Sequence, residues 1–315
     1  MTSTLITLDD ITLSFKVKKA ELRVLDGVSL DLYPQEIYCL VGESGCGKTT
    51  TGKVITGLLK ATTGKFLYKG KDVEQFNKEE KKKYRLGVQL VHQDPYASLN
   101  PTQSVFEIIS APLLHHHLVS STETAEQKVI ELLELVDLTP PEDFLHKYPH
   151  QLSGGQRQRI SVARAVSINP SLIIADEAVS MVDVSIRISL LAMMKHLRDS
   201  LGMSIVLITH DLALAKFFAG QGRIGVMYLG RIVEERQAAD LVSAPLHPYT
   251  RALISAIPEA DPEVTRTKER FELRSMDIPS LLNRPSGCSF HPRCPFHLEG
   301  ICDKFVPELI PSAQG

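Results

Sequence analysis

The sequence lacks long apolar runs, an excess of one charge and a dense set of cysteines, and each absence excludes a class of protein. No stretch approaches the ~18 consecutive apolar residues that would span a bilayer. The 35 basic and 37 acidic residues give no general attraction to nucleic acid. Five cysteines are too few and too unevenly placed for a disulfide scaffold. The first residues lack the basic and apolar regions of a signal peptide. We therefore expect a soluble, cytoplasmic protein that acts on a membrane only through a partner.

Apolar strands that alternate with helices predict an α/β fold with a parallel sheet covered on both faces. Strands are expected at residues 5–8, 11–15, 28–32, 36–41, 87–92, 172–175 and 204–209. Helices are expected at 48–59, 124–136 and 156–166, the last two inside a mainly helical region of about 96–167. After residue 245 prolines recur and periodicity fades, so we predict a catalytic domain over 1–248 and an extension over 249–315.

A phosphate-binding loop follows the expected strand at 36–41. It matches the pattern G-x-x-x-x-G-K-[ST] and consists of Gly42, Glu43, Ser44, Gly45, Cys46, Gly47, Lys48 and Thr49. Its glycines let backbone N–H groups converge on phosphate oxygens, and the following helix adds its positive end. Lys48 supplies a charge to the β- and γ-phosphates, and the Thr49 hydroxyl can ligate Mg²⁺. We include Thr50 in the nucleotide-binding set.

Two further stretches complete the expected site. Asp176 and Glu177 end the apolar strand at 172–175, where the first carboxylate can hold the metal and the second can polarise the attacking water. The glycine-rich stretch of Ser153, Gly154, Gly155 and Gln156 opens a helix and forms a second anion site. One domain is not expected to fold both anion sites onto one phosphate, so we predict a head-to-tail dimer that shares each nucleotide.

These motifs resemble the nucleotide-binding subunits of ATP-binding cassette (ABC) transporters over roughly residues 5–245. The resemblance implies a P-loop NTPase cassette with a parallel core, an N-terminal antiparallel β subdomain, a helical subdomain and a cysteine-containing extension. It implies that Gln93 contacts Mg²⁺ and the transmembrane partner, that Phe15 stacks on adenine, and that His210 contacts the γ-phosphate. By the same resemblance Asp183 links the two sites of the dimer, and Lys48, Glu177 and His210 are the catalytic residues. ATP and Mg²⁺ are the implied ligands, with Thr49, Gln93 and Asp176 around the metal.

A finer resemblance is to the ATPases of dipeptide, oligopeptide and nickel importers. The sequences of four segments are typical of that group: residues 93–101, 148–159, 247–253 and 287–295. It implies two transmembrane permease subunits, a second ABC ATPase that is a paralogue rather than a copy, and an extracytoplasmic solute-binding protein. The expected location is the cytoplasmic face of the plasma membrane. A peptide cargo is favoured, with oligosaccharides or nickel as alternatives.

Cys288, Cys294 and Cys302 lie in the extension with the spacing C-x₅-C-x₇-C, unlike the C-x₂-C pairs of zinc ribbons. Related ATPases carry four tail cysteines that resemble iron–sulfur ligands, which implies a [4Fe-4S] cluster here. Zinc, completed by His291 or His297, and free thiols are the alternatives. We expect the extension to fold around a metal without taking part in hydrolysis.

Two other functions stay open. A soluble cassette ATPase acting on DNA or ribosomes would need long coiled-coil insertions or a second cassette, and this chain has neither. A redox-sensing module that only holds nucleotide would not need Glu177 and His210. Ala178 and Val179, which replace the Pro-Thr common after the glutamate, leave every charged group in place.

Overall fold

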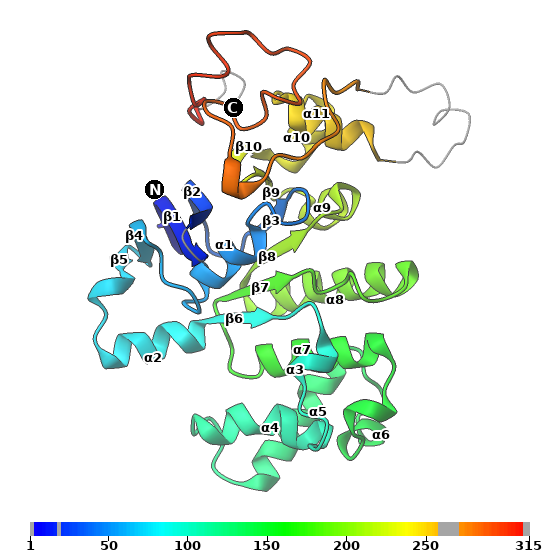
Figure 1. Ribbon diagram of the computed structural model, residues 1–315. Coiled ribbons are helices and arrows are strands. Elements are labelled where there is room, and N and C mark those ends of the chain that lie inside the picture. Colours follow the sequence, from blue (N-terminus) through cyan, green and yellow to red (C-terminus); the bar gives the residue numbers. More distant parts are fainter. Residues whose placement is uncertain (1–2, 18–19, 258–270, 311–315) are drawn as a thin grey trace.

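The computed structural model describes residues 3–17, 20–257 and 271–310, and its centre is a six-stranded sheet (Figure 1). The strand order is β10-β9-β3-β8-β7-β6. The pairs β9–β3, β3–β8, β8–β7 and β7–β6 are parallel, and β10 is antiparallel to β9. The strands are β3 (Ile37–Val41), β6 (Val88–Val91), β7 (Leu172–Asp176), β8 (Ser204–Thr209), β9 (Arg223–Tyr228) and β10 (Arg231–Gln237). The predicted parallel core is confirmed.

A second, antiparallel sheet has the order β2-β1-β4-β5. Its strands are β1 (Ile6–Val17), β2 (Ala20–Leu32), β4 (Thr63–Tyr68) and β5 (Lys71–Asp72). The prediction of two separate strands at 5–8 and 11–15 was wrong. They are one strand whose register shifts between Leu8 and Ile11, where Asp10 has φ 52°, and this irregularity breaks the alternation that marks a strand.

Helices cover the central sheet and form a separate layer at one end of it (Figure 1). They are α1 (Lys48–Ile55), α2 (Lys78–Gly87), α3 (Pro95–Ser98), α4 (Val105–His115), α5 (Thr122–Leu135), α6 (Glu142–Leu145), α7 (Gly154–Val166), α8 (Val184–Leu201), α9 (Leu212–Ala219), α10 (Ala238–Ser243) and α11 (Pro248–Ser255). Short 3₁₀ turns are η1 (Val73–Gln75), η2 (Pro149–Gln151) and η3 (Leu281–Asn283). The α1 helix ends before the predicted residue 59, because Gly57 adopts φ 72° and reverses the chain. No helix in the described ranges has both the length and the apolar character required to cross a bilayer.

The core lies on both faces of the central sheet, as the period of two in a strand requires. On β3, Cys39 and Val41 join the cluster that packs under α7, α8 and α9, whereas Tyr38 and Leu40 join the cluster shared with α1 and the antiparallel sheet. Cys39 is fully buried, and burial raises the pKa of its thiol. Cys39 is therefore a core residue of the central sheet.

The parallel strands place several polar residues at one edge of the sheet. β3, β6, β7 and β8 all end at this edge. Gly42, Glu177 and His210 directly follow β3, β7 and β8, and Gln93 is the second residue after β6. In open parallel sheets, ligands bind outside the carboxyl ends of the strands. The fold therefore brings four segments that are far apart in the chain to one binding edge.

Candidate functional site

The loop between β3 and α1 wraps around the start of the helix, and its glycines are needed for two different reasons. A Cβ atom on Gly42 would lie 2.1 Å from the carbonyl oxygen of Met227, so the loop can approach β9 only without a side chain. Gly45 has φ 78° and open space around it, so the backbone conformation is what requires glycine there. The loop thus has the close approach and the positive φ angles that let consecutive N–H groups face an anion.

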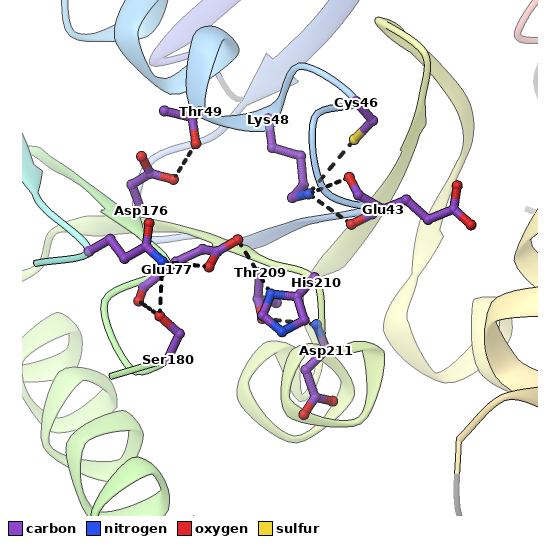
Figure 2. A network of polar contacts seen from close by, with 12 residues as sticks. Glu43, Cys46, Lys48, Thr49, Asp176, Glu177, Ser180, Thr209, His210 and Asp211 are labelled. Carbon is purple, nitrogen blue, oxygen red and sulfur yellow. Dashed lines mark hydrogen bonds and ion pairs between the residues drawn. The ribbon is translucent and has the colours of Figure 1, made fainter. Parts of the chain in front are cut away.

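Lys48 and Thr49 start α1 at the base of this loop. The buried Lys48 ammonium donates to the carbonyl oxygens of Gly42 (2.7 Å) and Glu43 (2.9 Å). The Thr49 hydroxyl donates to Asp176 Oδ1 over 2.9 Å (Figure 2). Burial, and to a smaller degree the charge of Glu177, raise the pKa of Asp176, while the bond from Thr49 lowers it. A hydroxyl and a carboxylate oxygen meeting at one point are hard donors that fit Mg²⁺.

Glu177 is the centre of a polar network at the end of β7 (Figure 2). Its Oε1 lies 3.3 Å from His210 Nδ1, and its Oε2 accepts a hydrogen bond of 3.1 Å from Gln93 Nε2. Its φ angle is 46°, in the left-handed region that non-glycine residues rarely adopt. Such backbone strain concentrates at functional sites. The structure therefore brings together the predicted carboxylate, histidine and glutamine.

The predicted signature stretch lies elsewhere in the same chain. Ser153 caps α7 and forms a capping box with Gln156, whose N–H donates to Ser153 Oγ over 3.2 Å while its side chain accepts from the Ser153 N–H. α7 packs against α3, α4, α5, α8 and β6, whereas α1 packs against β2, β7 and β8. Figure 1 accordingly shows α1 and α7 on opposite sides of the β6–β7 pair. The two predicted anion sites of one chain do not meet.

Two further predicted residues are exposed. Phe15 on β1 pairs in register with Leu22 and is 39% exposed, so its ring is accessible on the antiparallel sheet. Asp183 begins α8 and is exposed, with the exposed apolar side chains of Met181 and Val184 beside it. Ala178 and Val179 are buried in the core, and this explains how apolar residues are accommodated after Glu177.

The tail cysteines do not fit the expected cluster. Cys294 is buried, and burial together with the nearby thiols raises the pKa of both Cys294 and Cys288. Cys302 accepts a hydrogen bond at its sulfur from the N–H of Leu298. Among the residues that the structure describes, no three His, Cys, Asp or Glu side chains are grouped as metal ligands. The arrangement of the described cysteines therefore does not support a role for a metal in the extension.

Two residues that contact the phosphate loop at Glu43 were not predicted from the sequence. The Tyr249 hydroxyl on α11 accepts a hydrogen bond of 2.8 Å from the Glu43 N–H. Arg293 in the extension forms an ion pair with the Glu43 carboxylate. Both lie after residue 245, where the sequence has no periodic pattern that would connect them to the loop.

The site and fold together define a P-loop nucleotide hydrolase with a second glycine-rich helix start. In comparisons with known proteins, the ABC transporter family matches residues 25–180, and the oligopeptide/dipeptide transporter C-terminal region matches residues 233–302. The oligopeptide transport ATP-binding protein AppF of Bacillus subtilis is 42% identical over 300 residues, covering 95% of this chain and 89% of that relative. OppF of Salmonella typhimurium, of the same description, is 41% identical, covering 92% and 88%.

A solved structure extends the likeness to three dimensions. The dimeric ATP-binding cassette MJ0796, in a post-hydrolysis state bound to ADP and Pi, superposes with a TM-score of 0.66 at 28% identity, covering 74% of this chain and 98% of that chain. The predicted cassette fold is confirmed. The chain therefore belongs to the oligopeptide transport ATP-binding proteins of the ABC transporter family, and it is an ATPase of that type.

Proposed function

We propose that this chain is the ATP-hydrolysing subunit of a membrane importer for peptides. The observation that carries the proposal is the network in which Glu177 contacts both His210 and Gln93, beside Lys48 and the Thr49–Asp176 pair. This arrangement places a carboxylate, a histidine, a lysine and a candidate metal site at one edge of the sheet. These groups can supply what hydrolysis of a triphosphate uses, namely neutralisation of phosphate charge, a metal ion and a residue that orients the attacking water.

In the proposed reaction each residue acts at a defined atom. The N–H groups of the loop and the Lys48 ammonium bind the β- and γ-phosphates, and the phosphates take the place of the carbonyls that Lys48 now contacts. Glu177 polarises the attacking water, and His210 stabilises charge on the γ-phosphate. Thr49 and Asp176, with Gln93, would hold Mg²⁺, which neutralises phosphate charge when bound.

The proposed active unit is a head-to-tail dimer. Its support is the separation of the two anion sites within one chain, because the Ser153–Gly154 turn cannot complete the site of its own loop without large rearrangement. In the dimer each turn would face the loop of the other cassette, and Asp183, exposed beside Met181 and Val184, would lie at the contact between them. The second cassette is proposed to be a paralogue.

The remaining partners follow from the family. A peptide cargo is supported by the match of residues 233–302 and by relatives described as oligopeptide transport ATP-binding proteins. Such a subunit would bind two permease subunits at the cytoplasmic face of the membrane, and an extracytoplasmic solute-binding protein would deliver the peptide. The [4Fe-4S] cluster stays outside this proposal as a sequence prediction that the arrangement of the cysteines does not favour.

The test is the variant Glu177→Gln, which keeps the side chain's shape and removes its charge. We expect the variant to bind ATP and to dimerise, but to lose about a hundredfold or more in turnover, because no carboxylate polarises water. Equilibrium nucleotide binding, sedimentation and phosphate release measure the three properties separately.

A matched control is Glu131→Gln on α5, which removes an exposed carboxylate that pairs with Lys128 far from the site. Its turnover should equal that of the unaltered protein. Substantial hydrolysis by the Glu177 variant would remove this residue from the mechanism.

A further inference from the structure

The side chain of Glu43 points out of the nucleotide site and is bound by the extension. Figure 2 shows it directed away from Lys48 and Thr49. Both of its carboxylate oxygens accept hydrogen bonds from Arg293, Oε2 from Nη1 at 2.8 Å and Oε1 from Nη2 at 3.0 Å. The Arg293 side chain is only 5% exposed, and Glu43 is 25% exposed. A bidentate arginine–carboxylate pair fixes both distance and orientation, so this contact holds one end of the loop in place.

The backbone of the same residue is bound as well. The Glu43 N–H donates to the hydroxyl of Tyr249, a fully buried side chain on α11. Tyr249 packs against Tyr228 and Phe290 with ring centroids 4.6 and 5.4 Å apart, and the Arg293 guanidinium lies 5.6 Å from the Phe290 ring centroid. Tyr228 is on β9, whereas Phe290 and Arg293 belong to the extension. The loop therefore rests on a packed aromatic cluster to which cassette and extension both contribute.

The position of the loop determines where its N–H groups point. Farther along the loop, the backbone carbonyl oxygen of Cys46 accepts a hydrogen bond of 2.7 Å from the N–H of Gly230, which lies between β9 and β10. The loop is thus held by the β9–β10 connection near its middle, and by Tyr249 and Arg293 of the extension at Glu43. Backbone amides bind phosphate oxygens only within hydrogen-bond distance and at favourable angles, so a shift of the loop weakens these bonds. A contact that fixes Glu43 consequently acts on the affinity for ATP.

We propose that Arg293 is a positioning residue of the ATP site. In this role the extension holds the nucleotide-binding loop in the conformation that binds ATP. This inference rests on the proposed function, because it assumes that ATP binds at that loop. It differs from the expectation that the extension takes no part in hydrolysis. The Arg293 side chain touches no phosphate in this role, and its effect passes through the Glu43 carboxylate.

The experiment measures binding of a fluorescent ATP analogue with Mg²⁺, and steady-state hydrolysis, by full-length variants. Arg293→Met should weaken nucleotide affinity and raise KM by roughly tenfold or more, while kcat at saturating ATP stays within about threefold, because bound phosphates pull the loop into place. Arg293→Lys keeps the charge without the fork and should recover part of the affinity. Glu43→Gln should reproduce the loss. The double variant Arg293→Met with Glu43→Gln should have about the same nucleotide affinity as the single variant with the lower affinity, because both substitutions break the same ion pair.

The matched control is Arg284→Met, which breaks a different contact between extension and cassette. Arg284 pairs with Asp26 and donates to the Arg23 carbonyl at 2.9 Å, and neither partner belongs to the loop of residues 42–49. Its nucleotide affinity should stay within about twofold of the unaltered protein. An equal loss in both arginine variants, unchanged affinity in Arg293→Met, or additive losses in the double variant would each overturn the proposal. If Arg293→Met does not fold because Glu43 is left unpaired, the double variant, which removes both charges, decides the question.

These outcomes are distinct from failure of the proposed function. If the unaltered chain binds no nucleotide, the cassette assignment is lost. If it binds and the Arg293 variants bind equally well, only the role of the extension is lost.

Discussion

His247 is a partly buried residue between the cassette and the extension, and its environment keeps it neutral. Burial lowers its pKa to about 4, against a small opposing effect of Glu234. Its ring Nδ1 accepts a hydrogen bond of 3.1 Å from the Tyr249 N–H and so caps α11. The backbone N–H of His247 donates to the Glu234 carboxylate. Its ring also packs on Phe290. A proton on Nδ1 would remove the cap of the helix that supplies Tyr249.

This shift predicts a loss of stability in acid. The pKa in the unfolded chain is about 6.5, so between about pH 6.5 and pH 4 the unfolded state binds more protons than the folded state. The contribution of His247 is therefore complete above pH 6.5 and falls as the pH is lowered, with a slope approaching about 1.4 kcal/mol per pH unit. Urea denaturation at pH 7 and pH 5 measures it.

The comparison variant is His247→Asn, since asparagine can still cap the helix but does not titrate in this range. We expect its free energy of unfolding to fall less between pH 7 and pH 5 than that of the unaltered chain. Equal pH dependence in the two proteins would show that the pKa of His247 is the same in the folded and the unfolded chain.

At the scale of the element, α7 shows that two adjacent glycines can serve different purposes. A Cβ atom on Gly154 would meet only Val182, at 3.8 Å, an ordinary contact. A Cβ atom on Gly155 would lie 2.8 Å from Ile186 Cγ2 on α8. Gly155 is therefore required by the packing of α7 against α8, whereas nothing within the chain requires Gly154 to lack a side chain.

This difference predicts that the two alanine variants affect different properties, fold stability for Gly155→Ala and association for Gly154→Ala. Gly155→Ala should destabilise the fold by about 1–3 kcal/mol through overpacking. Gly154→Ala should leave stability within about 0.5 kcal/mol, but should weaken ATP-dependent association by roughly tenfold if this turn faces the phosphates of a second cassette. Thermal unfolding and sedimentation with ATP separate the effects. Association unchanged by Gly154→Ala would argue against a role of the turn in the dimer.

At the scale of the whole molecule, the chain contains two helix starts that are predicted to bind anions and that its own fold keeps apart. α1 and α7 contact different elements, and Figure 1 shows them separated by β6 and β7. A rigid monomer therefore offers only half of each proposed site. Residues 271–310 of the extension lie at the opposite end of the molecule from the helical layer, near α11 and β10 (Figure 1), and they contact the cassette through Arg284 and Arg293.

The prediction at this scale is that turnover per chain rises with concentration. Below the dissociation constant of the dimer, dilution should lower the specific activity roughly in proportion to the fraction of dimer. Phosphate release measured over a dilution series, with the paralogue added in equal amount where one is used, tests this. A specific activity that is constant on dilution to concentrations at which sedimentation finds only monomer would rule out a shared site.

Motifs whose residues are consecutive in the chain could be predicted from the sequence. The loop of residues 42–49 lies between a strand and a helix as expected, and Asp176 and Glu177 end an apolar strand. Strands β4, β5, β9 and β10 were not predicted. β4 and β5 are short or exposed, β10 has a mixed pattern, and a short apolar run such as β9 is not distinguished by its pattern from a buried helix segment. The continuous β1 was not predicted either, because its irregularity at Asp10 depends on pairing with β2 and β4.

The amino-acid sequence alone determined the chemistry of this protein, because a glycine loop with its lysine and threonine, or an acidic strand end, is built from neighbours in the chain whose spacing fixes their geometry. Only the tertiary structure decided that His210 and Gln93 meet at Glu177 and that Arg293 holds the back of the loop through Glu43. These contacts join residues that are far apart in the sequence. They depend on strand order and on how the extension packs, and no local pattern encodes either.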